Sequence, residues 1–345
     1  MKKIFLLLLL AAATCFAQQI IVGDPAEPCG PIRPDYWFSR KTNPFPRGEG
    51  VGVRSETKAA LSPKAALTDS YTFYTNVRVN DNPPGTSFET PYSSGAHAIA
   101  AKGDTVYLVW RSDRLISGGG KTTIYFDKSI DGGNTWGTDV RITDSDSSAL
   151  MPALAVGKDG TIYVSWTDFR DASGYRHIYF AKSTDGGASF GPSVRVSAES
   201  GEMPQAKSSI AVNDSGYIFI AYEDWRNYTT TAMDIYCSRS LNSGASFLSG
   251  VKVNSDIDSI DQWFPSIAAN DSMVYVVWEA FPDTAYTGGG EIVCFSKSSN
   301  SGNSFGINKL VNDTVGLSPY NAGTPSIAVF DTLIYIAWYD NRTPG

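Results

Sequence analysis

The residues of this chain best suited to chemistry are arginine–aspartate pairs that recur at a fixed place in a repeated pattern. A W-x-D-x-R element, with Tyr for Trp in one copy, spans 166–170, 222–226 and 338–342. Its charged members are Asp168, Arg170, Asp224, Arg226, Asp340 and Arg342, and an earlier variant of the element supplies Arg114. Because a guanidinium fits a carboxylate through two parallel hydrogen bonds, a circle of such groups suits a carboxylated or hydroxylated sugar.

The same pairs have a structural interpretation, which we favour. Each Asp lies two residues before its Arg, so the pair can close a salt bridge or anchor a turn within its own repeat. A motif present in most repeats fits that role better than it fits a single active site, and structural ion pairs imitate functional ones.

Five strand-like segments position these pairs. They end at Trp110, Trp166, Tyr222, Trp278 and Trp338, with spacings of 56, 56, 56 and 60 residues. Each alternates aromatic and β-branched residues with a period of two, which is typical of a sheet strand. A small apolar strand precedes each segment, and two further strands follow each of the first four. Every unit is therefore predicted to be a four-stranded meander, and stacked meanders of this length indicate propeller blades.

The turn after the third strand has a fixed form, S-x-D-x-G-x-[ST]-[WF]. Its members are Ser129, Asp131, Gly133 and Trp136 in the first copy and Ser183, Asp185, Gly187 and Phe190 in the second; Asn242, Gly244 and Phe247 follow in the third, and Asn300, Gly302 and Phe305 in the fourth. The carboxylates can accept backbone N–H groups across the hairpin, and the glycines permit positive φ. We therefore expect these residues to be structural.

This turn resembles the Asp box, or BNR repeat, of the sialidase-like propeller superfamily. The resemblance implies an all-β, sialidase-like β-propeller of the six-bladed type, with four-stranded antiparallel blades. It also places the boxes on the face opposite the ligand site. A sialidase would need three arginines on one carboxylate, a Tyr–Glu pair and an acidic proton donor. Pro31-Ile32-Arg33-Pro34 has the residues of the family's arginine motif in another order, so that role is not assigned to Arg33.

The chain divides into three expected regions. Residues 1–17 have two lysines, an apolar run and small residues before Gln18, which predicts a secretory signal peptide cleaved after Ala17. Residues 18–70 lack a period and are expected to form an irregular leader. Residues 71–345 hold about four complete blades and a partial one, so we expect an incomplete ring, with Val77–Asn80 as the outer strand of the closing blade.

Composition narrows the function. Signal removal takes Lys2 and Lys3 and no acidic residue, so the formal net charge changes from −7 to −9, which disfavours nucleic acid as a partner. The mature chain keeps three cysteines, and Cys237 and Cys294 are expected to fill the core unpaired. With two histidines and no ordered spacing among Asp144, Asp146, Asp256, Asp258 and Asp261, no metal site is predicted. We expect no cofactor and no transmembrane segment in the mature chain.

Two functions remain open from the sequence. The favoured one is a secreted, extracellular or periplasmic propeller that binds carbohydrate or a cell-surface protein, with no catalytic residue assigned. The alternative is an exo-α-sialidase-type glycoside hydrolase. Trp225, Trp263 and Tyr320 fall in loops of the expected ligand face, where they either stack on sugar rings or only cover loops.

Overall fold

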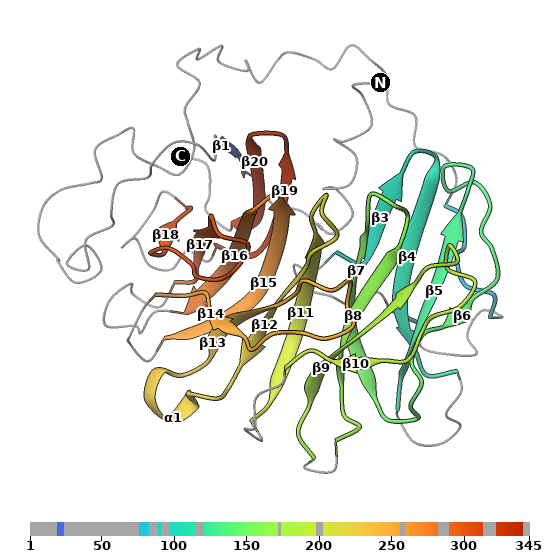
Figure 1. Cartoon of the computed structure of the whole chain (residues 1–345), viewed down its shortest axis with the longest axis horizontal. Helices are drawn as coiled ribbons and strands as arrows, with labels where there is room; N and C mark the ends of the chain where they lie inside the picture. The colour runs from blue at the N-terminus through green and yellow to red at the C-terminus, as the bar shows by residue number, and fades with distance from the viewer. Residues whose placement is uncertain are drawn as a thin grey trace, which may run out of the picture.

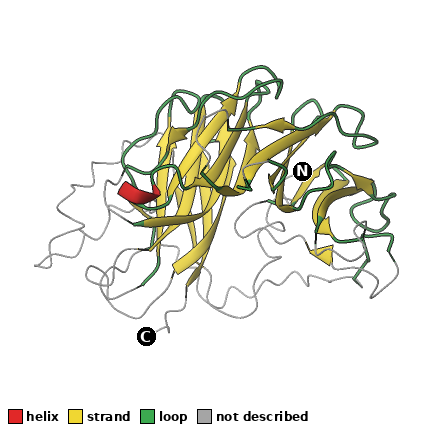
Figure 2. Ribbon diagram, turned by 90° about the horizontal axis from the view of Figure 1, so that it is seen from below, coloured by secondary structure: helices red, strands yellow, loops and turns green. Residues whose placement is uncertain are grey.

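The structure is a computed structural model. It describes residues 19–23, 76–82, 89–90, 97–114, 121–171, 174–197, 203–255, 260–281, 290–312 and 322–340. These residues are almost entirely β-structure, and the described helix, α1, is the four-residue Tyr228–Thr231. Figure 2 shows the strands stacked side by side with this single short helix at their edge.

The strands form a fan of antiparallel sheets, which we call blades 1 to 5 (Figure 1). Blade 1 contains β3 (Ile99–Lys102), β4 (Thr105–Ser112), β5 (Thr123–Ser129) and β6 (Val140–Arg141), with β2 (Glu89–Thr90) also paired to β4; blade 2 contains β7 (Ala149–Val156), β8 (Ile162–Asp168), β9 (His177–Ser183) and β10 (Val194–Arg195). Blade 3 contains β11 (Gln205–Val212), β12 (Ile218–Asp224), β13 (Asp234–Ser240) and β14 (Val251–Lys252); blade 4 contains β15 (Asp261–Asn270), β16 (Met273–Phe281), β17 (Ile292–Ser298) and β18 (Lys309–Leu310). The predicted four-stranded antiparallel sheets are confirmed.

Blade 5 combines the two ends of the described chain. It contains β19 (Ala322–Phe330) and β20 (Leu333–Asp340), and β1 (Gln19–Gly23) pairs antiparallel with β20. This five-residue strand lies within the segment expected to be an irregular leader. It takes the place next to β20 that β17 takes next to β16 in blade 4.

The hydrophobic cores lie between blades rather than within one sheet. One cluster joins Phe219 and Ile235 of blade 3 to Val276 and Trp278 of blade 4, and similar clusters join the other neighbouring pairs. All seven residues of β8 and of β12 are buried. Their sheets are covered on both faces, so the aromatic and β-branched side chains on either side of the pleat find apolar neighbours.

Residues 77–80 are described without a strand, and no described strand pairs with them. The residue that follows them nevertheless makes the contact expected of a blade. The Asp81 N–H donates to Asp139 Oδ2 at 3.0 Å, and the Asp139 N–H donates to Asp81 Oδ2 at 2.9 Å. One blade further on, Asp144 accepts the Ser193 N–H at 2.9 Å in the same way. Asp81 thus makes the same contact with blade 1 that Asp144 makes with blade 2.

Candidate functional site

The predicted turns after the third strands are closed hydrogen-bonded units, which we call box turns. In the first, the Ser129 hydroxyl donates to Asp131 Oδ1 at 2.6 Å, and the Thr135 N–H donates to the same oxygen at 2.9 Å. The Gly133 N–H donates to Ser129 Oγ at 2.8 Å. Ser183, Asp185, Gly187 and Ser189 repeat these bonds, and Asn242 and Asn300 accept the equivalent N–H groups at 3.0 Å.

The box turns of blades 2, 3 and 4 also join their blades to the preceding one. Lys128 donates to the Gly186 carbonyl at 2.5 Å, Lys182 to that of Ser243 at 2.7 Å, and Arg239 to that of Ser301 at 2.7 Å. Phe190 packs edge-on against Phe126 of blade 1, and Phe247 packs likewise against Phe180 of blade 2. Trp136 and Phe305 are half-buried. These contacts give the box residues a structural role.

The arginine–aspartate pairs are bound within their own blades. Arg170 contacts Asp168 at 2.7 Å, and its guanidinium lies 4.2 Å from the Tyr179 ring centroid. Asp168 is fully buried and also accepts the Trp166 indole N–H at 2.8 Å. This carboxylate is held from several sides and is closed to a ligand.

Arg226 repeats this pairing, whereas Arg114 is bound by an aspartate that directly precedes β6, another strand of its blade. Arg226 contacts Asp224 at 2.6 Å and stacks 3.9 Å above Tyr236. Arg114 contacts Asp139 at 2.5 Å and stacks 3.9 Å above Tyr125. Asp340 is buried and accepts the Trp338 indole N–H at 3.4 Å, while Arg342 lies outside the described residues. In these contacts no two arginines share a carboxylate, and the contacts of Arg114, Arg170 and Arg226 lie at strand ends.

A second repeated feature, absent from the sequence analysis, lies at the start of the first strands. Met151, Lys207, Phe264 and Thr324 have φ between 45° and 54° although none is glycine. Each sits where the pairing of the first and second strands shifts register, as at a β-bulge. Left-handed backbone at non-glycine residues is strained and persists only where its surroundings enforce it. Bulges of this kind often lie beside functional sites. We call this side of the fan the bulged end.

The enforcing contacts come from the preceding blade. The Lys207 N–H donates to Thr167 Oγ1 at 3.1 Å, the Phe264 N–H to Glu223 Oε1 at 2.9 Å, and the Thr324 N–H to Glu279 Oε2 at 2.7 Å. The three acceptors are the residues directly after Trp166, Tyr222 and Trp278. These acceptors stand at the first variable position of the W-x-D-x-R element, or at its equivalent in blade 4, and this position was the one sequence signal for the bulge contacts. The local sequence does not show that the next blade donates a hydrogen bond to it.

Glu223 and Glu279 belong to a buried charged cluster. Lys207 Nζ lies 3.1 Å from Glu223 Oε1, and 4.0 Å and 3.6 Å from the ring centroids of Trp263 and Phe264. Glu223 is fully buried and Glu279 is 3% exposed. The carboxyl groups of Glu223 and Glu279 therefore both lie near the Lys207 ammonium.

Burial dominates the protonation of this cluster. It raises the pKa of Glu223 to about 7, although Lys207 and the Phe264 N–H act in the opposite direction. Burial likewise raises the pKa of Glu279 to about 7, with Glu291 and Glu223 adding repulsion. The pKa of Lys207 is lowered by burial. Both carboxyl groups thus exchange protons near neutrality, as groups used for acid–base chemistry do.

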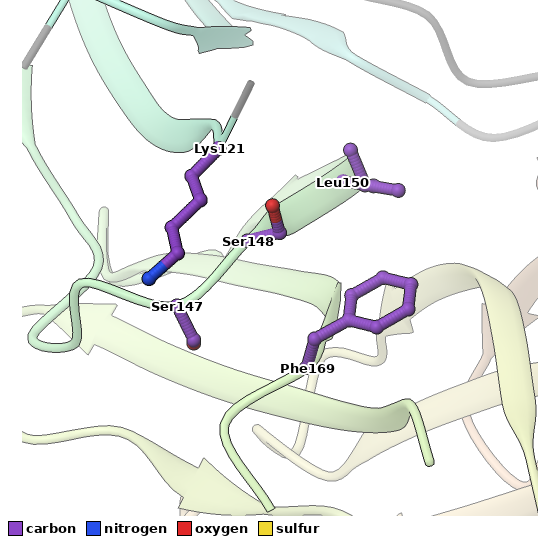
Figure 3. Close-up of a pocket in the computed structure, with 5 residues that line it drawn as sticks. All are labelled: Lys121, Ser147, Ser148, Leu150 and Phe169. Carbon is purple, nitrogen blue, oxygen red and sulfur yellow. The ribbon is translucent and has the colours of Figure 1, made fainter. Parts of the chain in front are cut away.

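A shallow hollow of about 420 Å³ lies between blades 1 and 2 at the bulged end. Figure 3 shows Lys121 and Phe169 reaching it from opposite sides, with Ser148 between them. Leu150 and Ser147 complete the lining. A cation, a hydroxyl and a ring face around one hollow can contact the polar and the apolar parts of a sugar together.

The two ends of the fan differ in their exposed apolar side chains. At the bulged end, those among the described residues are all aromatic: Phe169, Tyr175, Tyr228, Phe281 and Tyr339. At and beside the box turns they are Ile130, Leu241, Leu248, Ile307 and Phe330. Trp225 and Trp263 are half-buried at the bulged end, and Tyr320 is not among the described residues. Aromatic rings that are partly exposed to solvent are typical of recognition surfaces.

The remaining predicted residues are accounted for as follows. Cys237 and Cys294 are free and buried, as expected. Asp144 contacts Arg170, Asp146 contacts Arg141, and Asp261 accepts the Met233 N–H; Asp256 and Asp258 lie outside the described residues. Within the described ranges, no three His, Cys, Asp or Glu side chains are grouped to hold a metal. None of the helical structure described has the length and hydropathy of a membrane-spanning helix.

Comparison with known proteins identifies the fold. No family model and no curated protein matches the chain. The α-L-arabinofuranosidase of Fusarium graminearum, of family GH93, is 17% identical over 77% of this chain and 85% of its own, with a TM-score of 0.54. The α-L-arabinanase of Penicillium chrysogenum is 14% identical over 72% and 82%, with a TM-score of 0.50. The chain has the β-propeller fold of such glycan-acting enzymes.

A sialidase also matches in part. The Hadza microbial sialidase Hz136 is 13% identical over 75% of this chain and 53% of its own, with a TM-score of 0.47. At the identities of the arabinofuranosidase and the arabinanase the likeness is one of fold, and function has to be argued from the site.

Proposed function

We propose that this protein is a secreted, sialidase-like Asp-box propeller that binds glycans through its bulged end. Secretion through residues 1–17, the Asp-box assignment and a six-bladed ring are parts of this proposal. The segregation of exposed side chains supports it most directly. Five exposed aromatic rings from blades 2 to 5 share the bulged end, whereas four of the five exposed apolar residues at the box end are aliphatic.

Ring faces match the chemistry of a sugar. The C–H faces of a pyranose or furanose are apolar and its rim carries hydroxyls, so a binding surface needs flat apolar platforms with polar groups beside them. Phe281 is 36% exposed and packs edge-on against Trp263, with ring centroids 5.9 Å apart. At the hollow, Phe169 is paired with the Ser148 hydroxyl and the Lys121 ammonium. The hollow thus places a ring next to polar groups, and Phe281 with Trp263 forms a second aromatic platform.

The sialidase alternative has less support. It requires several arginines on one substrate carboxylate, whereas Arg114, Arg170 and Arg226 contact different carboxylates of the protein itself. The glycan-binding proposal does not depend on them.

A glycan array followed by titration calorimetry with the best oligosaccharide tests the proposal. We expect Phe281→Ala and Phe169→Ala each to weaken binding about tenfold, corresponding to ~1.4 kcal/mol per ring contact. Phe330→Ala is the matched control, since Phe330 is 58% exposed at the box end, and it should leave the affinity unchanged. Absence of glycan binding, or equal losses in all three variants, would refute a binding surface at the bulged end.

A further inference from the structure

Glu279 lies just beneath the surface of the bulged end. Its Oε2 accepts the N–H of Thr324, which is itself exposed, so the carboxyl group is one residue away from solvent. Gly323 leaves room for it, because a Cβ at that position would collide with the Glu279 carboxyl group. The neighbouring blade therefore shapes a fitted recess around this side chain.

The charged groups that face Glu279 come from blades 3 and 4. Glu291 and Glu223 repel its ionised form, and Lys207 is the cation among its principal neighbours. Lys207 is itself bound to Glu223 and lies against two aromatic rings, while Arg176 is a further cation near Glu223. Glu223 Oε2 is buried without a hydrogen-bond partner among the described residues. Lys207 is thus paired with Glu223, whereas among the described residues the hydrogen bond that Glu279 accepts comes from a backbone N–H.

The two carboxyl groups thus differ in their partners, while burial raises the pKa of both to about 7. A glutamate paired with a lysine is better placed to carry a negative charge, and an unpaired one beside it is better placed to keep a proton. The same division of roles between two neighbouring carboxyl groups underlies acid catalysis of glycoside cleavage.

We propose that Glu279 is the proton donor of a glycoside-hydrolysing centre and that Glu223, held by Lys207, is its positioning residue. The proton of the Glu279 carboxyl group passes to the glycosidic oxygen as the bond from that oxygen to the anomeric carbon breaks, and the alcohol leaves. Water then forms a bond to the anomeric carbon and gives its proton to the Glu279 carboxylate. The products are the released alcohol, a sugar with a hemiacetal at the anomeric carbon, and the starting carboxylic acid, so one water is consumed. This inference rests on the proposed glycan binding.

The test measures monosaccharide release by chromatography from 3′-sialyllactose, α-1,5-arabinobiose, xylobiose and cellobiose between pH 5 and 9. We expect cleavage of at least one of them and a rate that falls on the alkaline side as Glu279 loses its proton. Glu279→Gln should lower kcat by about 10²–10⁴-fold, the range for a general acid, with glycan affinity retained. Asp214→Asn, an exposed change at the box end, is the control and should match the parent.

The role of Glu223 is tested by the pH profile. Glu223→Gln keeps an oxygen for the Phe264 N–H but removes a negative charge near Glu279, so the alkaline limb should move to lower pH. Glu291→Gln should move it in the same direction. Glycan binding without cleavage of any of the four substrates would overturn this inference and leave the binding proposal standing. An undiminished rate in Glu279→Gln, or an unmoved limb in both other variants, would also overturn it.

Discussion

Phe190, the last residue of the second box turn, packs edge-on against Phe126 in β5 of the preceding blade, with ring centroids 5.3 Å apart. Phe247 and Phe180 repeat the contact one blade further on at 5.1 Å. A turn that looks local in sequence is therefore also a contact between blades. It belongs to the inter-blade cores that hold the fan together.

This contact predicts the cost of removing one ring. Phe190→Ala should lower the free energy of unfolding by about 2–4 kcal/mol, because a half-buried ring and its edge-on partner are both lost. Urea denaturation at 25 °C followed by tryptophan fluorescence measures it. Ile130→Ala, an exposed change in the first box turn, should stay within about 0.5 kcal/mol. Equal effects of the two changes would contradict an inter-blade role.

Two turn glycines, Gly244 in the third box turn and Gly216 in the turn between β11 and β12, separate two costs of substitution. Gly244 has φ +82°, and a Cβ there would overlap the Phe180 ring, whereas Gly216 has φ +76° with no atom within 4 Å. Gly216→Ala should cost only the left-handed backbone, about 1–2 kcal/mol. Gly244→Ala should cost about 1–3 kcal/mol more, since the ring of the preceding blade must shift. Comparing the two denaturation midpoints checks this, and equal midpoints would argue against close packing at Gly244.

Acid should weaken the first two box turns selectively. Hydrogen bonds from Ser129 and Thr135 lower the pKa of Asp131 to about 2, and the equivalent bonds lower the pKa of Asp185. A depressed folded-state pKa contributes stability that is present above the unfolded value of about 4 and is lost as pH falls toward 2. The double variant Asp131→Asn, Asp185→Asn resembles the turns of blades 3 and 4. Its urea midpoint should fall less between pH 5 and pH 3 than that of the parent.

Arg170 should matter for stability more than for ligand binding. Arg170→Ala removes a partner from the buried Asp168 and should destabilise the protein by about 1–2 kcal/mol. Glycan affinity should be unchanged in titrations of the folded variant. Arg78→Ala, which removes an exposed contact to Asn80, is the control and should have little effect on stability. A loss of glycan affinity without a loss of stability would instead indicate that Arg170 binds the ligand.

The buried glutamates predict a pH effect of the opposite sign to that of the box turns. The pKa of Glu223 and that of Glu279 rise to about 7, so the folded state keeps protons that the unfolded chain has released. Their contribution to stability is full below the unfolded value of about 4.5 and is lost as pH rises through 7. His97 and His177, whose pKa values are lowered by burial, act in the other direction.

The measurement is therefore a comparison of variants. Between pH 5 and pH 7.5, the unfolding free energy of the parent should change more toward instability than that of Glu223→Gln, Glu279→Gln. Identical pH slopes in urea titrations would show that the two carboxyl groups are not perturbed in the folded protein.

Much of the fold could be predicted because each repeat consists of strand and turn patterns formed by residues close together in the sequence. The alternation around Trp166 and Trp278 marks the second strands, and the Ser, Asp and Gly of each box turn mark the hairpins that follow. Arg170 and Asp168, two residues apart, form the in-blade salt bridge that the favoured, structural interpretation of the arginine–aspartate pairs predicts. The pairing of β1 with β20 was not predicted, because more than 300 residues separate them and no pattern links them.

By itself the sequence determined the blades, because strand alternation and tight turns depend on residues that are near neighbours in the chain. Only the tertiary structure decided the candidate site. Lys207, Glu223 and Glu279 come from separate strands of blades 3 and 4, and their burial and mutual repulsion exist only once the blades are stacked. Electrostatic effects of this kind depend on distance and desolvation in space, which spacing along the chain does not encode.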